Sequence, residues 1–425
     1  MRTLAALFTA FFLSGLVLAE CRTTEAVDSE SIPPTSRQLL RETGYQHFSA
    51  GQYQAAMACY TEALQAAEAR GSNNRSAIAR DLNDIAILSE EMGRYTEARK
   101  VYARELDALE PLGDGAGAAI GEVYGERGGL SLIEGSLGSA EADYKKAIAL
   151  LKRHAGREDL RTAKALAGLG RLYTESGNFY EASQLLHEAK AIAENSAPHG
   201  NAALINILDS EAALLSRTGK FAEAEKRWLN ALNIAEHTFG EDGAQYIALL
   251  LHLGQLYTEI HEYESAEALL QRALAAVQKT RGADEMDTAI MMSALGNVYL
   301  QQHKMVEAEP LFLQSLGTIK GSCAAVPLAC AAVRSSLGDY YMLKHQWQAA
   351  DTEYEQALTM RENALGEHPL VAASLLSTSR ALRKLQRKKE ARAFVSRAQQ
   401  ILSMPGNAAL AGDKTIDVRA FRAGN

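Results

Sequence analysis

The sequence predicts an all-α solenoid of eight or nine helical hairpins, and three observations support this prediction. One pattern returns every 42 residues, with a glycine or a histidine at its turn. Apolar residues at helical spacing lie on both sides of the turn. Only 8 of the 425 residues are proline, which suits helices. A strict internal period of this length indicates stacked repeats rather than separate globular domains.

The turns mark the repeats along the chain. They are expected near residues 51, 93, 135, 177, 219, 261, 303, 345 and 386, the last copy being one residue short. Glycine suits a turn with positive φ, and histidine is one of the residues that tolerate it. His261, His303 and His345 are therefore interpreted as turn residues. They are not expected to share a metal ion, because helices pack about 8–10 Å apart whereas zinc–nitrogen bonds are about 2 Å.

The fourth copy shows the expected hairpin in detail. Its first helix is predicted over residues 159–176, and its second helix begins at Phe179. Gly170 lies inside the first helix, where it costs about 1 kcal/mol relative to alanine. Glycine or alanine returns at this position in each of the first eight copies. A small residue at a fixed position of the helix predicts a close approach of the second helix.

Residues 1–19 are expected to be a secretory signal peptide. They contain one arginine, an apolar run from Leu4 to Leu18, and small residues before a cleavage point after Ala19. The run is too short for a membrane span. Two alternatives remain open: an uncleaved anchor, and a lipoprotein modified at Cys21, although Glu20 stands where a small residue is needed. The mature chain is expected to have no transmembrane span and to be exported, to a bacterial periplasm.

The rest of the chain divides into three parts. Residues 20–36 are polar and are expected to form a flexible linker, residues 37–402 the repeat array, and residues 403–425 a C-terminal tail. An exported compartment permits disulfides. Cys323 and Cys330 flank Pro327 in a lengthened connection, which predicts a disulfide between them. The alternative is a pair of buried thiols. Cys21 and Cys59 are a second candidate pair.

These repeats resemble the tetratricopeptide repeat. The resemblance rests on Leu169-Gly170-Arg171-Leu172-Tyr173, on the glycine-x-aromatic turn, and on the Ala-Leu pairs of the second helices. The usual repeat has about 34 residues, whereas this one has 42. The longer form resembles the repeats of kinesin light chain, as does the stretch Leu365–Pro369. The resemblance implies a right-handed superhelix that binds a peptide or a partner domain in its concave groove.

The resemblance also implies where binding residues lie, because first helices line the groove in that family. The exposed first-helix positions lie 13, 10, 9 and 6 residues before each turn, and they include His252. The predicted groove residues are Arg80, Asn83, Lys164, Arg171, Asn206, Asp209, Gln255 and Asn297. Amides offer a donor and an acceptor to a peptide backbone, and cationic side chains can meet a carboxylate. Only Asn83 matches the asparagine that peptide-binding members often carry ten residues before the turn.

The sequence contains no phosphate loop, zinc-ligand spacing or nucleophile motif. We therefore expect no catalytic residue, no metal and no cofactor. The net charge of −8 argues against nucleic-acid binding. The leading hypothesis is an exported protein-interaction scaffold. A small-ligand or peptide-signal sensor is the first alternative, and an enzyme that uses Arg171, Asp209 and His252 is the second.

The ninth copy is strongly basic. Its cations are interpreted either as the solvated face of a terminal repeat or as a dock for an acidic partner. They are Arg380, Arg383, Lys384, Arg387, Lys388, Lys389, Arg392 and Arg397.

Overall fold

The computed structural model describes residues 34–49, 52–71, 74–92, 94–196, 202–280, 286–324 and 327–404. The expected signal peptide, Cys21 and nearly all of the expected tail lie outside these residues, as does the expected linker up to residue 33. The chain forms two compact units, Met1–Val123 and Tyr124–Asn425. Each unit is described by itself.

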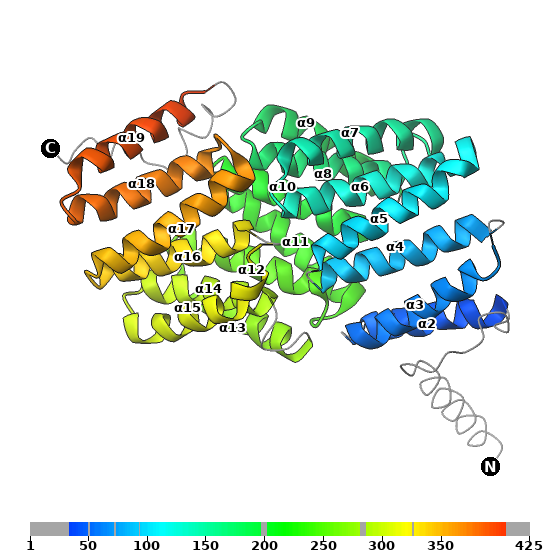
Figure 1. Cartoon of the computed structure of the whole chain (residues 1–425), viewed down its shortest axis with the longest axis horizontal. Helices are drawn as coiled ribbons and strands as arrows, with labels where there is room; N and C mark the ends of the chain where they lie inside the picture. The colour runs from blue at the N-terminus through cyan, green and yellow to red at the C-terminus, as the bar shows by residue number, and fades with distance from the viewer. Residues whose placement is uncertain are drawn as a thin grey trace, which may run out of the picture. The chain divides into compact units, whose positions relative to one another are not determined.

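Among its described residues, the first unit contains two helical hairpins, which can be followed in Figure 1. Its elements are α2 (Pro34–Ser49), α3 (Tyr53–Glu68), α4 (Arg75–Glu91), α5 (Tyr95–Leu109) and the 3-10 helix η2 (Glu110–Ala116). Helix α2 begins three residues before the expected start of the array. The physical reason is that proline is tolerated at the first helical position, where no backbone donor is needed.

The second unit continues the pattern from α6, whose first residues precede the unit boundary. The described helices form successive pairs: α6 (Gly117–Ile133) with α7 (Leu137–His154), α8 (Leu160–Glu175) with α9 (Phe179–Ser196), α10 (Ala202–Arg217) with α11 (Phe221–Phe239), α12 (Ala244–Glu259) with α13 (Tyr263–Thr280), α14 (Met286–Gln301) with α15 (Met305–Ile319), α16 (Pro327–Leu343) with α17 (Trp347–Leu365), and α18 (Pro369–Lys384) with α19 (Lys388–Leu402). The fold is all-α, as the sequence predicts. None of the described helices is both long and apolar enough to cross a membrane.

The turn residues that the structure describes adopt the conformation expected of them, whereas the predicted turns at Gly51 and Gly93 lie outside the described residues. Gly135, Gly177 and Gly219 have φ between +76° and +81°. The three histidines at the equivalent position have φ of +67°, +60° and +58°, and Gln386 has +62°. This confirms the interpretation of His261, His303 and His345 as turn residues. Their side chains pay a cost that glycine avoids.

The small residue of each first helix makes room for a large side chain from the second helix. A Cβ atom added to Gly170 would lie 2.8 Å from Cγ of Leu186, and one added to Gly338 would lie 2.5 Å from Cε1 of Tyr354. The large residue stands nine positions after each turn, at Tyr60, Tyr102, Tyr144, Leu186, Trp228, Leu270, Phe312 and Tyr354. The close approach that the sequence predicts is therefore made by this side chain.

Buried apolar residues run continuously through the middle of the second unit. One core cluster includes Leu166 of α8, Ile207 of α10, Leu250 of α12 and Met291 of α14, each at most 4% exposed. The hairpins from α8 to α14 therefore share one core, as expected for a stacked array. This packing fixes which face of each first helix remains open to a ligand.

The connection between α15 and α16 contains a disulfide. The Sγ atoms of Cys323 and Cys330 are 2.10 Å apart, and the 3-10 helix η3 (Lys320–Ser322) precedes them. Cys330 is fully buried. The bond joins the end of one hairpin to the first helix of the next.

Within the second unit, segments distant in sequence also meet. A Cβ atom added to Gly135, at the turn between α6 and α7, would lie 3.0 Å from Cδ1 of Leu328 and 3.2 Å from Cβ of Ala364. Leu328 belongs to α16 and Ala364 to α17. The unit is thus held by contacts between distant repeats as well as by contacts between neighbours.

Candidate functional site

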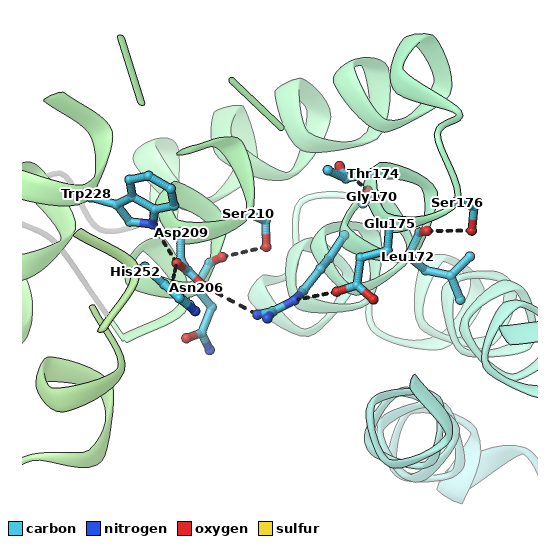
Figure 2. Close-up of polar contacts among 11 residues, drawn as sticks. Gly170, Leu172, Thr174, Glu175, Ser176, Asn206, Asp209, Ser210, Trp228 and His252 are labelled. Carbon is cyan, nitrogen blue, oxygen red and sulfur yellow. Dashed lines mark hydrogen bonds and ion pairs between the residues drawn. The ribbon is translucent and has the colours of Figure 1, made fainter. Parts of the chain in front are cut away.

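The first helices α8, α10 and α12 follow one another in space, since α10 contacts both of the others. We call the side that they form the first-helix face. A cluster of polar side chains lies on this face around Asp209 of α10. Figure 2 shows Trp228 and His252 meeting this carboxylate.

Asp209 accepts hydrogen bonds from two rings. Nε1 of Trp228, from the second helix α11, donates to Oδ1 over 2.8 Å, and Nδ1 of His252 lies 2.6 Å from the same oxygen. The Trp228 and His252 ring centroids are 6.0 Å apart. An ionised carboxylate can only accept, so Nδ1 of His252 carries the proton. In a neutral ring Nε2 would accept a hydrogen bond, and in a protonated ring it would donate one.

Arg171 completes the cluster from α8. Its Nη1 lies 3.3 Å from Oδ2 of Asp209, and its Nε lies 3.4 Å from Oε1 of Glu175 on the same helix. The Arg171 side chain is 43% exposed, whereas that of Asp209 is only 14% exposed. The acid is therefore enclosed, and the guanidinium remains accessible to a ligand.

The electrostatics of the cluster keep Asp209 ionised. Burial acts to raise its pKa, but the charges of His252 and Arg171 and the hydrogen bonds from His252 and Trp228 outweigh burial. The pKa of Asp209 is held well below its usual range. A carboxylate with three donors on it orients its neighbours and does not exchange protons near neutral pH.

Three of the predicted groove residues present unoccupied side chains. Lys164, Asn206 and Gln255 are exposed, and none has a side-chain hydrogen bond or an ion pair within the described ranges. Asn206 is one turn of α10 before Asp209, and the two are drawn next to each other in Figure 2. An exposed amide side chain without a partner can form hydrogen bonds with the backbone of an extended peptide.

The remaining predicted residues lie elsewhere. Arg80 and Asn83 belong to the first unit, where Arg80 lines a hollow together with Arg41 and Asp84. The amide of Asn83 lies 3.5 Å from Oε2 of Glu105. Asn297 of α14 donates to Oγ of Ser336 over 3.0 Å. The structure therefore brings Arg171, Asn206 and Asp209 together, with His252 beside them, and leaves Lys164 and Gln255 exposed on the two first helices that flank α10.

Trp228 is the residue of this cluster that sequence reasoning missed. The sequence already carried a signal for it. Trp228 is the one tryptophan at the position nine residues after the turn, which otherwise holds tyrosine, leucine or phenylalanine. Comparable contacts occur at Tyr102, whose hydroxyl donates to Glu90 over 2.5 Å, and at Tyr354, whose hydroxyl donates to Asp339 over 2.5 Å. Large residues of second helices therefore reach acids on first helices.

The basic ninth repeat is partly neutralised within the chain. Arg387 pairs with Asp351 at 2.8 Å and with Glu390 at 2.7 Å. Arg397 pairs with Glu362 and with Glu367. These pairs support the interpretation of a solvated terminal face, although Lys388, Lys389 and Arg392 remain exposed.

The stacked hairpins define an α-helical repeat protein, and comparisons with known proteins assign its family. One tetratricopeptide repeat model matches residues 204–279, 260–318 and 328–403, and a second matches residues 162–196. Together they cover more than half of the chain. The chain belongs to the tetratricopeptide repeat family. No curated protein matches it.

Solved structures with similar folds have low sequence identity. A Rap protein complexed with Competence and Sporulation Factor is 15% identical, with a TM-score of 0.61, over 86% of this chain and 97% of that chain. Aspartyl phosphate phosphatase F from Bacillus subtilis is 13% identical, with a TM-score of 0.50, over 91% and 98%. A putative kinesin light chain from Podosopora anserina is 20% identical, with a TM-score of 0.37, over 46% and 93%.

Proposed function

We propose that the protein is an exported scaffold that binds a peptide, or an extended segment of a partner protein, on its first-helix face. The family supports a protein or peptide partner in general. The observation that supports this face is the pairing of a pre-organised centre at Asp209 with unoccupied amides at Asn206 and Gln255. Fixed polar groups lose little entropy on binding.

Each group has a role in this proposal. Asn206 and Gln255 bond backbone amides of the peptide, and Arg171 and Lys164 meet an acidic side chain or a terminal carboxylate. Hydrogen bonds from Trp228 and His252 orient the carboxylate of Asp209, and this carboxylate in turn positions the guanidinium of Arg171. The ionised, fully bonded state of Asp209 favours binding over acid–base catalysis. We therefore propose a non-enzymatic role.

Site-specific crosslinking tests the face directly. A photoreactive amino acid at position 206 should capture one recurrent partner segment, whereas the same group at position 230, on the exposed side of α11, should not. A synthetic peptide of that segment is then titrated by calorimetry. The double variant Asn206→Ala, Gln255→Ala should bind it about thirtyfold more weakly, since each of the two lost hydrogen bonds is worth about 1 kcal/mol.

The matched control is Asn230→Ala, which removes an exposed amide from a second helix. It should leave the affinity unchanged. Equal affinity of the double variant and the parent protein would contradict the proposed face. Export is tested separately: fractionation and N-terminal sequencing should give an exported chain that begins at Glu20, and a chain that retains Met1 inside the cell would contradict it.

A further inference from the structure

The outer surface of α15 differs from that of every other second helix that the structure describes. Positions 3, 7, 10 and 14 residues after each turn lie on one side of the second helix, because they are spaced by three or four residues. Each of the other second helices has at least one polar side chain among these positions. In α15 the four residues are nonpolar and exposed, and we call them the α15 stripe: Val306, Pro310, Leu313 and Gly317.

The stripe leaves two large apolar side chains in water. Val306 is 84% exposed and Leu313 is 47% exposed. Single apolar residues on a protein surface are common, but these two share one helix face on which no stripe position is polar. Burial of this face against another protein is favourable, because the hydrophobic effect grows with the apolar area removed from water. The stripe is therefore a candidate contact surface.

Two residues of the stripe are unfavourable for the helix that carries them. Pro310 is the sixth residue of α15, where proline removes a backbone hydrogen bond. Gly317 also lies inside α15, where glycine is less favourable than alanine. A Cβ atom added to Gly317 would meet nothing within 4 Å, whereas one added to Gly296 of α14 would lie 2.8 Å from Cε1 of Phe312. Packing within the chain therefore requires Gly296 but does not require Gly317.

The stripe is complementary to itself when a second copy runs in the opposite direction. Val306 and Gly317 are equally far from a point just after the seventh residue of α15, and Pro310 and Leu313 are equally far from the same point. Two antiparallel α15 helices packed about this point place Val306 of each copy over the open space at Gly317 of the other. The Pro310 ring of each copy then meets Leu313 of the other.

Polar side chains beside the stripe match in the same arrangement. Glu307 and Gln314 are exposed, lie on one flank of the stripe, and have no side-chain hydrogen bond or ion pair with the residues that the structure describes. In the antiparallel pair, Glu307 of each copy lies beside Gln314 of the other, so a carboxylate acceptor meets an amide donor. The macrodipoles of the two helices also point in opposite directions, which is favourable.

We propose that the α15 stripe is a self-association surface, on which a second copy of this chain docks through its own α15 to form a twofold-symmetric dimer. Glycine at position 317 permits the close approach of the two helices. One pair of helices buries less than the roughly 1,200–2,000 Å² of a stable interface, so the dimer forms reversibly. The stripe belongs to a second helix, and the proposal does not depend on peptide binding at the first-helix face.

Sedimentation equilibrium of the full chain tests the dimer, over concentrations of about 1–300 µM. We expect a reversible monomer–dimer equilibrium. Leu313→Glu brings two like charges together at the twofold axis and should weaken dimerisation at least about tenfold. The matched control is Leu229→Glu, since Leu229 occupies the same position in α11 and is 46% exposed. It should leave the equilibrium unchanged.

Two outcomes of sedimentation would overturn the proposal. One is a monomer at every concentration, and the other is equal weakening by Leu313→Glu and Leu229→Glu. A photoreactive amino acid at position 313 distinguishes another occupant. It should crosslink to α15 of a second copy, whereas crosslinking to residues 405–425 of the same chain would assign the stripe to that segment instead.

Cysteine crosslinking tests the antiparallel register. A mixture of Val306→Cys and Gly317→Cys chains should form a mixed disulfide-linked dimer under mild oxidation, because the two positions face each other. Val306→Cys alone should not, since its two copies lie about 16 Å apart along the helix axes, at about 1.5 Å per residue. A disulfide requires Cα atoms within about 7 Å. Equal crosslinking of Val306→Cys alone and of the mixture would contradict the proposed pairing.

Discussion

The indole nitrogen of Trp228 donates a 2.8 Å hydrogen bond to Asp209, and so joins the second helix of a hairpin to the polar surface of its first helix. The same carboxylate receives His252 from the next hairpin and Arg171 from the preceding one. Three consecutive repeats are therefore coupled through one acid. Changes at Asp209 should affect both stability and binding.

Asp209→Asn should destabilise the chain by about 2 kcal/mol in urea unfolding, because hydrogen bonds to an ionised group contribute about 1.5–3 kcal/mol. Trp228→Phe keeps an aromatic ring but removes the donor, and should cost about 1 kcal/mol. The control Asp107→Asn, at an exposed acid of α5, should have little effect. A loss at Asp107 equal to that at Asp209 would contradict the role of the cluster.

The Asp209 contribution has a defined pH dependence. The folded state lowers the pKa of this carboxyl group, so its stabilisation is present above the unfolded pKa of about 3.9. The difference in unfolding free energy between the parent and Asp209→Asn should stay constant from neutral pH to about pH 4 and shrink only below it. Disappearance of the difference between pH 7 and pH 5 would be inconsistent with a lowered pKa.

Gly168→Ala should destabilise the second unit by about 1 kcal/mol. A Cβ atom at Gly168 would lie 2.3 Å from Cε1 and 2.5 Å from Cζ of Tyr144. Overpacking of this kind costs about 1–3 kcal/mol, which exceeds the helix-propensity gain of about 1 kcal/mol. Gly125→Ala is the matched control, since its Cβ would lie 3.9 Å from Cβ of Ala147. That variant should be neutral or stabilising, and Tyr144→Leu should partly rescue Gly168→Ala.

His303→Gly should raise the free energy of unfolding by about 0.5–1 kcal/mol. The φ of +60° strains a residue with a Cβ atom, and relief of that strain exceeds the greater entropy that glycine has in the unfolded chain. His345→Gly should gain less, because the His345 ring packs against Trp347 at a centroid distance of 4.9 Å. Thermal unfolding of the two variants checks this order, and a loss of stability in His303→Gly would refute the strain argument.

His368 should make the chain less stable in mild acid. The folded state lowers its pKa from 6.5 to about 4, so the unfolded state binds the extra proton between these values. Stability should therefore rise with pH across this window, by roughly 3 kcal/mol in total if the other groups are constant.

The variant His368→Asn keeps an N-cap acceptor without a titrating ring. Comparison of its unfolding with that of the parent at several pH values, in chloride buffer, isolates the contribution of His368. The difference should change across pH 4 to 6.5. A parallel pH dependence of the two proteins would show that another group is responsible.

The sequence by itself determined the repeat architecture. The 42-residue period, the turn residue and the small residue of each first helix are local requirements of backbone conformation and of helix contact, so they recur and can be recognised. The positive φ of His261 and the all-α fold follow from these requirements. Residues that build the hairpin therefore identify the family but not the ligand.

Only the tertiary structure decided which polar residues act together. Trp228 and Asp209 are on different helices, and Gly135 and Leu328 are separated by 193 positions in the chain. Their encounters depend on how the hairpins stack and on which large side chain fills the space above each small residue. The sequence places a residue on a helix, whereas charges and hydrogen bonds act through space. The contact between Trp228 and Asp209 could therefore not be found from the repeat pattern alone.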